Sequence, residues 1–449
     1  MKSVTIHPAP HLRGTITVPG DKSISHRALI FSALAEGESH IKNLLLGEDV
    51  MSTMRILQQL GIHMSHRPEE LKAGDTLTVF GAGLHSLKPT KEILDCGNSG
   101  TTMRLMMGLL SAQPFESVLT GDHSLNRRPM ERVMKPLSEM GAHFDMEHKG
   151  GERFIRVCGT KKIAGSPLGG GKNFHLPIAS AQVKSAILLA ALFAKEETLV
   201  VEPAASRDHT ERMLAAMGAR LFKKGNEVMI GPATKLKSVD ITVPGDFSSA
   251  AFFLVGGLIV PHSEIVLKDV GVNPTRSALV DVLREMGGKL TVQKPRIVTD
   301  EPVADMMVQS STLRAHDLKG EIIPKLIDEI PLFAVAASKA RGQSSISDAA
   351  ELRVKESDRI AVLAVELRKM GVNVTEKPDG LVLSGGAPLR GGTLDSHGDH
   401  RIAMSLAIGA LTAGNSSIIS DIECVATSFP GFFEFLSQLT HSTTAQGQS

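Results

Sequence analysis

Cysteine is scarce in this sequence, since its 449 residues include only Cys96, Cys158 and Cys424. No two of them have a CxxC spacing, which argues against a disulfide framework and against a zinc knuckle. The 17 histidines form no HExxH or HxH pattern, and DxD-type carboxylate clusters are absent. We therefore expect a protein of a reducing compartment that binds no metal.

Excess charge and long apolar segments are also missing. The formal net charge is +1 and 22% of residues are charged, which argues against nucleic acid or an anionic membrane as a bulk electrostatic partner. The longest strongly apolar stretch, around residues 186–194, is much shorter than a membrane span, and the opening MKSVTIHPAP has no apolar signal segment. We expect a cytoplasmic protein in which a local cluster of side chains binds any anion.

An internal repeat is the strongest positive feature. TVPGDKSISHRALIFSALAEG begins at Thr17 and TVPGDFSSAAFFLVGGLIV begins at Thr242, and both predict a strand, a turn and an apolar helix. Four more polar loops run into apolar helices, at Asp95, His175, Ile322 and Asp395. Between them an amphipathic helix ends five times in Leu or Met followed by Gly, which is a helix stop, and an alternating strand pair follows.

Each repeat is therefore predicted to be helix, strand, helix and two strands. The sixth copy lacks its strand pair, whereas the chain begins with SVTIHP and GTITVPG. We infer that these N-terminal strands complete the last copy. The length favours two domains, and we predict one at 18–244, a second formed by 1–17 with 245–440, and a disordered tail at 441–449.

The polar loops of the first three copies are rich in cations and hydroxyls. Lys22 and Arg27 flank Ser23 at a helix start, where backbone N–H groups and the helix dipole favour an anion such as phosphate. The alternative is a solvated helix start with Ser23 or Ser25 as N-cap. Comparable groups in the next two copies are Asn98 to Thr102, Arg104, Arg127, Arg128, Ser180 to Gln182, Lys184, Arg207 and His209.

The last three copies add carboxylates to this pattern. Their loops contain Asp328, Glu329, Lys355, Glu356, Asp358, Arg359, Asp399, His400 and Arg401. Carboxylates beside an anion site are either paired with cations or used for proton transfer. Their position in three successive equivalent loops favours acid–base chemistry, although each alone is more often a surface ion pair.

Taken together, the motifs resemble the 5-enolpyruvylshikimate-3-phosphate (EPSP) synthases over nearly the whole chain. The motifs are PGDKSISHRA, GNSGTTMR, RRPM, SAQVKSA, SRDHTE, LRVKESDR and GDHRIAMS, in that order. The resemblance implies an α/β fold with two inverse α/β-barrel domains of three repeated units each and an active site between the domains. It also implies transfer of the enolpyruvyl group of phosphoenolpyruvate to shikimate 3-phosphate in aromatic amino-acid and chorismate biosynthesis. We expect a monomer without cofactor or metal.

The resemblance also implies roles for individual residues. The predicted contacts of shikimate 3-phosphate are Lys22, Ser23, Arg27, Ser180, Ala181, Gln182, Arg207, Asp328 and Lys355. Those of phosphoenolpyruvate are Lys22, Gly100, Arg128, Gln182, Arg359 and Arg401. The catalytic residues are Asp328, which takes the 5-hydroxyl proton, Glu356, which exchanges a proton at the methylene carbon, and Lys22, which holds the leaving phosphate.

Two positions bear on inhibition by glyphosate. Thr427, in VATSFP, stands where many members of the family have lysine, and this pattern resembles a glyphosate-tolerant subgroup. Gly100, however, stands where tolerant members of that subgroup have alanine. We hypothesise that the enzyme is a glyphosate target and is sensitive to the inhibitor.

Two other functions are compatible with the repeat. A sister enzyme transfers enolpyruvyl to UDP-N-acetylglucosamine, but it normally relies on a cysteine in a mobile loop, and none of the three cysteines has that context. A non-catalytic anion-binding scaffold would use the same cationic loops, but it would give no reason for Asp328 and Glu356.

Overall fold

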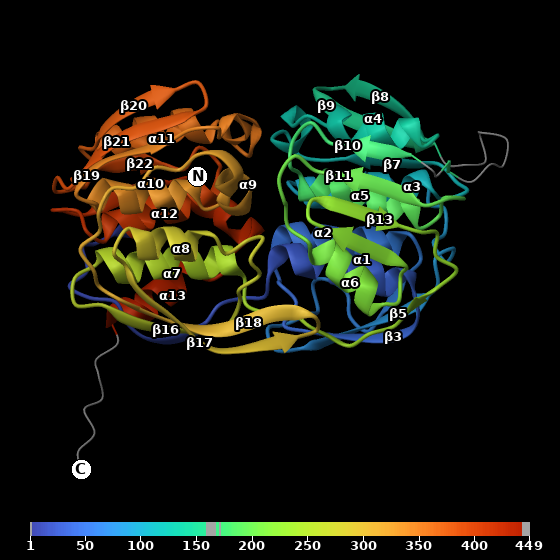
Figure 1. The fold of residues 1–449 in the computed structure, drawn as a ribbon, viewed down its shortest axis with the longest axis horizontal. Helices are drawn as coiled ribbons and strands as arrows, with labels where there is room; N and C mark the ends of the chain where they lie inside the picture. The colour runs from blue at the N-terminus through green and yellow to red at the C-terminus, as the bar shows by residue number, and fades with distance from the viewer. Residues whose placement is uncertain (1, 159–167, 170–171, 442–449) are drawn as a thin grey trace, which may run out of the picture. The chain divides into compact units, whose positions relative to one another are not determined.

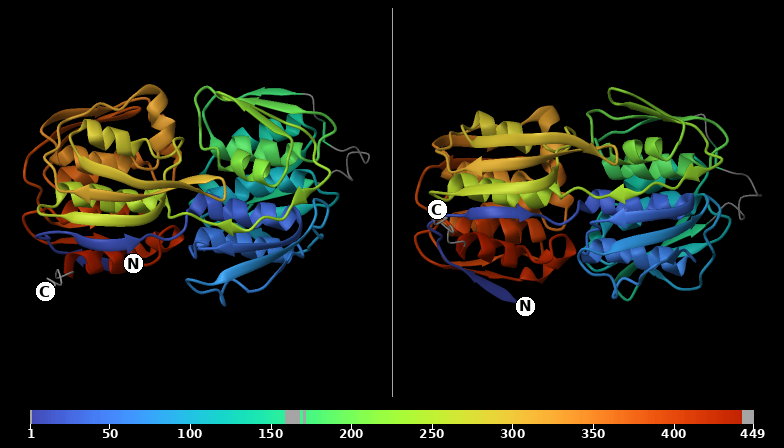
Figure 2. Two further views of the ribbon diagram at one scale, coloured as in Figure 1. Left: turned by 60° about the horizontal axis from the view of Figure 1, so that its bottom comes forward. Right: turned by 90° about the horizontal axis from the view of Figure 1, so that it is seen from below.

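The computed structural model describes residues 2–158, 168–169 and 172–441. The chain divides into unit 1, made of Met1–Pro19, Pro244–Ile297 and Pro302–Ser449, and unit 2, made of Gly20–Val243 and Val298–Glu301. Within each unit a group of helices lies at the centre and the sheets lie around it (Figures 1 and 2). The predicted α/β class and two-domain organisation are confirmed. No helix in the described ranges is both long and apolar enough to cross a membrane.

Unit 2 contains six α-helices and three open sheets in its described residues. The helices are α1 (Lys22–Leu34), α2 (Glu48–Gln59), α3 (Gly100–Ser111), α4 (Glu131–Glu139), α5 (Ala181–Ala191) and α6 (His209–Ala216), with a 3-10 helix η1 (Leu125–Arg127). The sheet orders are β14-β3-β5-β4 with β15 beside β3, β6-β7-β9-β8, and β10-β11-β13-β12. Their strands are β3 (Ala35–Lys42), β4 (His63–Met64), β5 (Thr76–Ala82), β6 (Leu94–Asp95), β7 (Ser117–Thr120), β8 (His143–Lys149), β9 (Glu152–Cys158), β10 (Asn173–His175), β11 (Thr198–Val201), β12 (Leu221–Lys224), β13 (Glu227–Ile230), β14 (Leu236–Lys237) and β15 (Ile241–Thr242).

Unit 1 also has three open sheets in the described part of the chain, ordered β17-β18-β16-β2, β19-β21-β20 and β1-β23-β22. Its helices are α7 (Phe247–Ile259), α8 (Leu279–Glu285), α9 (Ile323–Leu326), α10 (Ile330–Lys339), α11 (Arg359–Lys369), α12 (His400–Ala410) and α13 (Phe432–His441), with 3-10 helices η3 (Gly320–Ile322), η4 (Ala350–Val354) and η5 (Ile422–Thr427). Its strands are β1 (Ser3–Ile6), β2 (Arg13–Thr17), β16 (Glu264–Gly271), β17 (Lys289–Val298), β18 (Glu301–Gln309), β19 (Gly342–Ile346), β20 (Asn373–Lys377), β21 (Gly380–Gly385), β22 (Thr393–Asp395) and β23 (Ser417–Ser420). His441 ends α13, and the rest of the predicted tail lies outside the described residues.

The two N-terminal strands join different sheets. β1 pairs antiparallel with β23, as the prediction that the N-terminus completes the last copy requires. β2 instead pairs in parallel with β16, so the prediction is wrong for this strand. Without β1 and β2, β23 and β16 would each expose a row of unpaired backbone groups.

The predicted helix stops are found at all five glycines. Gly61, Gly141, Gly218, Gly287 and Gly371 follow α2, α4, α6, α8 and α11, with φ values of 86°, 103°, 86°, 93° and 85°. This left-handed backbone favours glycine because a side chain would be strained there. A strand pair follows each stop, as the alternating pattern predicts.

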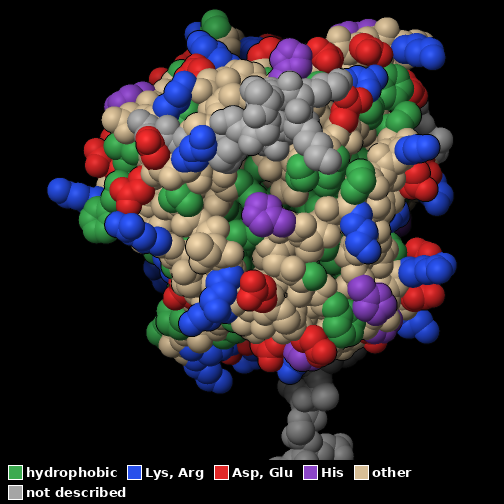
Figure 3. All heavy atoms as spheres, turned by 90° about the vertical axis from the view of Figure 1, so that its right-hand side faces the viewer, with side chains coloured by type: hydrophobic (Ala, Val, Ile, Leu, Met, Phe, Trp, Pro, Cys, Tyr) green, Lys and Arg blue, Asp and Glu red, His purple; other side chains and the backbone are tan. Residues whose placement is uncertain are grey.

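The central helices are apolar on nearly every side and are buried accordingly. Every residue of α7 is buried, and α1, α3, α5, α10 and α12 are nearly so. A helix without a polar face is stable in water only inside a core. On the surface of unit 2 shown in Figure 3, Lys and Arg side chains are interspersed with Asp and Glu, in keeping with the small net charge.

Close helix packing in unit 2 depends on one glycine. A Cβ atom at Gly108 of α3 would lie 2.4 Å from the carbonyl oxygen of Ala186 in α5. Glycine therefore permits the two helices to approach, which also brings their N-terminal residues together.

Candidate active site

The predicted anion loop at the start of α1 is capped by a carboxylate. Asp21 Oδ1 accepts a hydrogen bond from the Ile24 amide at 2.9 Å, and Ser25 Oγ accepts one from the Leu45 amide at 3.0 Å. The alternative of Ser23 or Ser25 as N-cap is therefore wrong. Ser23 lies in the first turn of α1, where the helix dipole favours an anion.

Lys22 is held at the same helix start by a carboxylate of α2. Its Nζ lies 3.0 Å from Asp49 Oδ2, and the Lys22 side chain is 16% exposed. The ion pair fixes the position of the ammonium, which has three N–H donors in all. Asp49 carried no signal in the sequence that would have identified it.

Hydroxyl and imidazole groups connect α1, α2 and α3. His26 Nδ1 lies 2.7 Å from Thr53 Oγ1, which lies 2.7 Å from Thr102 Oγ1. Burial, together with the nearby Lys22 and Arg27 cations, holds the pKa of His26 well below its ordinary value. His26 is therefore a neutral structural residue at pH 7.

Gln182 connects the starts of α3 and α5. Its Nε2 donates to Thr101 Oγ1 at 2.9 Å, and its Oε1 accepts from Arg104 Nη1 at 2.6 Å. Ser180 caps α5 through the Val183 amide at 3.4 Å. The structure thus brings Ser180, the following Ala181 and Gln182 into one turn beside α3.

Arg27 is more deeply buried than its place in a polar loop suggested. Its nitrogens donate to Thr210 Oγ1, the Ser23 carbonyl and Ser185 Oγ at 2.7, 2.9 and 2.7 Å. Burial lowers the pKa of Arg27 to about 10, Glu211 opposes this shift and Arg207 adds to it, so the group remains charged at pH 7. A guanidinium has about five N–H donors, so donors remain for a ligand.

Most residues of the SRDHTE motif have structural roles. Ser206 Oγ donates to Glu202 Oε1 at 2.5 Å. Asp208 pairs with Arg212 and Lys223, and His209 Nδ1 lies 2.7 Å from Glu301 Oε1. Arg207 is held between these anchored neighbours.

Lys184 does not belong to the anion site. Its Nζ lies 2.6 Å from Glu202 Oε2 and 2.8 Å from Glu211 Oε1, and its side chain is 1% exposed. Burial opposes its charge, but the two carboxylates raise its pKa. The prediction that Lys184 is one of the anion-loop cations is therefore wrong.

Gly100 and Arg128 lie together at the start of α3. A Cβ at Gly100 would lie 2.7 Å from Arg104 Nη1 and 3.1 Å from Arg128 Nη1. Arg128 Nη2 donates to Asn98 Oδ1 at 2.9 Å, which holds its guanidinium near the loop. Glycine here leaves room between two cations.

In unit 1, Arg359 is the centre of the carboxylate cluster. It lies 2.8 Å from Asp399, 2.7 Å from Glu356 and 3.5 Å from Asp328, and its side chain is 1% exposed. Burial opposes its charge, yet Asp399 and Glu356 raise the pKa of Arg359. The sequence left open whether these carboxylates are paired with cations or used for proton transfer. The cluster contains both paired carboxylates and possible proton acceptors, so both interpretations apply to it.

Two further predicted cations flank this cluster. Partial burial lowers the pKa of Lys355, while Asp328 and Glu351 oppose the shift. The Arg401 amide donates to Asp399 Oδ1 at 2.8 Å, but within the described ranges no hydrogen bond or ion pair reaches its guanidinium, although the residue is 5% exposed. Such a buried cation is costly unless a ligand compensates it.

A buried network at the start of α7 had no signal in the sequence. Asp246 Oδ1 caps the helix and accepts from Arg276 Nη2 at 3.0 Å, and Ser248 Oγ bridges Arg276 and Glu329. All four residues are at most 3% exposed. Glu329, predicted as one of the site acids, therefore lies in this network and is kept apart from solvent.

Comparison with known proteins identifies the family. The family model for EPSP synthase (3-phosphoshikimate 1-carboxyvinyltransferase) matches residues 6–436. The chain belongs to the EPSP synthase family. It is 50% identical to the 3-phosphoshikimate 1-carboxyvinyltransferase of Desulforudis audaxviator over 437 residues, which cover 97% of this chain and 99% of that protein. It is 49% identical to the same enzyme of Syntrophomonas wolfei over 430 residues, 96% and 97% of the two chains.

Solved structures lead to the same family. An EPSP synthase from Acinetobacter baumannii is 44% identical, with a TM-score of 0.85 and 98% of each chain covered. In the present chain, Thr427, which stands where the sequence analysis expects lysine in many family members, lies at the end of η5. Its Oγ1 is 3.4 Å from His400 Nδ1, beside the start of α12.

Proposed function

We propose that the chain carries out the enolpyruvyl transfer for which the family is named. The residues responsible are the cations and hydroxyls at the helix starts of unit 2 and the carboxylates and cations around Arg359 in unit 1. The chain transfers the enolpyruvyl group of phosphoenolpyruvate to the 5-hydroxyl of shikimate 3-phosphate, giving EPSP and phosphate. The observation that carries this proposal is the family match over residues 6–436, together with a full set of cations and acids at the motif positions.

We assign substrate binding in unit 2 to the helix starts of α1, α3 and α5. The proposed contacts of shikimate 3-phosphate there are Lys22, Ser23, Arg27, Ser180, Ala181, Gln182 and Arg207. Lys22, Gly100, Arg128 and Gln182 are assigned to phosphoenolpyruvate. The Lys22–Asp49 pair, the Arg128–Asn98 bond and the two Gln182 bonds support this assignment, because a fixed donor loses little entropy when it binds an anion.

In unit 1, Lys355 and Asp328 are assigned to shikimate 3-phosphate, and Arg359 and Arg401 to phosphoenolpyruvate. Arg401 supports this most directly, because the residue is only 5% exposed and its guanidinium has, in the described part of the chain, no side-chain partner. Arg359 is held rigidly by Asp399 and can still donate to a carboxylate or phosphate.

The proposed chemistry is an addition followed by an elimination. Asp328 takes the proton of the 5-hydroxyl as its oxygen attacks C2 of phosphoenolpyruvate, and Glu356 supplies a proton to the methylene carbon C3. Glu356 then takes a proton back from C3, which restores the double bond as the C–O bond to phosphate breaks, with Lys22 stabilising the departing phosphate. The partly exposed carboxylates of Asp328 and Glu356, at 19% and 15%, are accessible to a substrate.

We also propose that the fold consists of six related αβ units, three in each of two inverse α/β barrels. The order helix, strand, helix, two strands recurs along the chain, and the buried central helices support the interpretation. The domains are proposed at 18–244 and at 1–17 with 245–440. Cytoplasmic location, the monomeric state and the absence of a nucleic-acid or membrane partner remain predictions.

Asp328→Asn tests the role of the proposed base. The variant should bind both substrates, because the amide has the same shape, but turn over at least about a hundredfold more slowly. The matched control is Asp281→Asn, the same change at an exposed α8 residue whose side chain is 76% exposed. Unchanged turnover in Asp328→Asn would remove Asp328 from the mechanism.

A further inference from the structure

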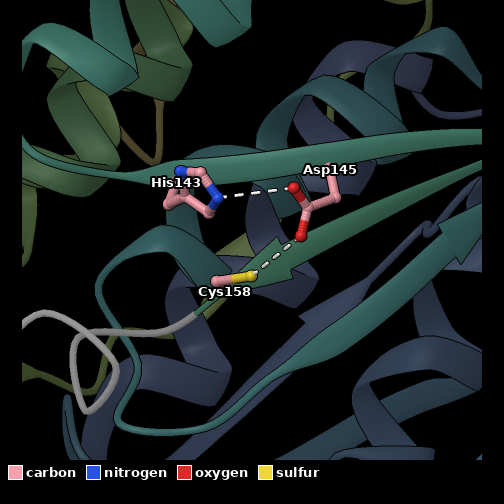
Figure 4. Close-up of side chains that lie close together, drawn as sticks. All are labelled: His143, Asp145 and Cys158. Atoms are coloured by element: carbon pink, nitrogen blue, oxygen red, sulfur yellow. Dashed lines mark hydrogen bonds and ion pairs between the residues drawn. The ribbon is translucent and has the colours of Figure 1, made fainter.

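A group of three potential metal ligands lies at the end of the β8–β9 strand pair, on residues assigned no role in the reaction. His143 and Asp145 belong to β8, and Cys158 is the last residue of β9. Each offers one ligand atom, and these atoms lie within 4.8 Å of one another. Figure 4 shows the three side chains pointing toward one another from the two neighbouring strands.

The strand register explains why the three side chains meet. His143 lies directly opposite Cys158, and Asp145 lies two residues farther along β8, on the same face. His143 Nε2 is 3.3 Å from Asp145 Oδ1, and Cys158 Sγ is 3.7 Å from Asp145 Oδ2. Tetrahedral zinc, with bonds of about 2.0 to 2.3 Å, places its ligand atoms about 3.4 to 3.6 Å apart. The side chains therefore need only small rotamer shifts to bind an ion.

The surrounding charge does not oppose a divalent cation. Arg156, the residue opposite Asp145, pairs with Glu116 and with Glu147 at 3.8 Å. Its positive charge is therefore offset by two carboxylates. The side chains of His143 and Asp145 are 62% and 51% exposed, so an ion can enter from solvent and keep a water molecule as fourth ligand.

We infer that His143, Asp145 and Cys158 form a binding site for Zn²⁺ or a similar borderline divalent cation that joins strand β8 to strand β9. A ligand set of one imidazole nitrogen, one thiolate sulfur and one carboxylate oxygen is typical of zinc and unsuited to magnesium or calcium. Binding releases the Cys158 thiol proton to solvent. Because β8 is the edge strand of its sheet, the ion would hold it in place.

Titration of the metal-free, full-length protein with Co²⁺ tests the site, because a thiolate ligand to cobalt gives a charge-transfer absorption band in the near ultraviolet. We expect one equivalent of Co²⁺ to produce the band and Zn²⁺ to displace it. Cys158→Ser should abolish the band, and His143→Gln should weaken binding at least tenfold. The matched control is His148→Gln, an exposed histidine on the opposite face of β8, which should bind as the wild type does.

Each other outcome overturns the proposal. The wild type could bind no Co²⁺, or bind it without the thiolate band. The band could survive Cys158→Ser, or His143→Gln could bind as tightly as His148→Gln. Because His143 is exposed, the His143→Gln result does not depend on whether the buried Cys158 tolerates substitution.

Discussion

Lys184 is predicted to be essential for the stability of unit 2. Lys184→Met removes the ammonium that lies between Glu202 and Glu211 and leaves two carboxylates, 2% and 3% exposed, without their cation. Breaking a buried ion pair by removing one partner costs about 3 to 5 kcal/mol. For a domain of this size about 2 to 4 °C corresponds to 1 kcal/mol, so the melting temperature should fall by about 6 to 20 °C.

Thermal unfolding at several pH values separates the electrostatic effect from lost packing. In Lys184→Met the buried carboxylates can become neutral by taking up protons, so the deficit should shrink as the pH falls from about 8 to 5. Adding Glu202→Gln and Glu211→Gln should restore most of the stability, because the two carboxylates that lost their cation are then neutral. The matched control is Lys224→Met, at an exposed position on β12.

Three results would refute this reasoning. The melting temperature of Lys184→Met could equal that of Lys224→Met, its deficit could be the same at every pH, or the triple variant could be no more stable than the single one. Any of these would mean that the Lys184 charge does not stabilise the fold.

Three further predictions concern the proposed anion site and its surroundings. Gly100→Ala should raise the KM for phosphoenolpyruvate about tenfold and weaken glyphosate inhibition, because the added methyl displaces the Arg104 and Arg128 guanidiniums; steady-state kinetics would show otherwise if both constants stayed unchanged. The wild type should be glyphosate-sensitive, and an inhibition constant far above the KM for phosphoenolpyruvate would contradict this. The pKa of His26 is depressed in the folded state, so below its ordinary pKa of about 6.5 the unfolded chain binds more protons than the folded chain does. The free energy of unfolding should therefore decrease as the pH falls below about 6.5, by up to about 1.4 kcal/mol per pH unit. Unfolding of His26→Gln should lack this component, and an identical pH dependence in both proteins would contradict it.

The sequence predicted the elements of the fold well because their signals are local. The five glycine stops and the apolar central helices follow from chain neighbours alone. The pairing of β2 with β16 could not be predicted in this way, since it joins residues about 250 positions apart, from Arg13 with Glu264 to Thr17 with Lys268.

The site was predicted only in part, because its sequence signals are also local. Motif positions identified the candidate ligands, but they did not separate exposed cations from buried ones. Lys184 and Arg401 look alike in sequence, and only the positions of Glu202 and Glu211 make Lys184 a core residue. Asp49 lies in α2 and Asn98 in the loop before α3, both distant along the chain from their partners Lys22 and Arg128, so their roles depend on the tertiary structure.

The most direct test of the central claim is phosphate release from phosphoenolpyruvate with two different acceptors. With shikimate 3-phosphate, the purified protein should release phosphate and form EPSP without added metal or cofactor. With UDP-N-acetylglucosamine it should release none. Phosphate release only with UDP-N-acetylglucosamine, or with neither acceptor, would contradict the account.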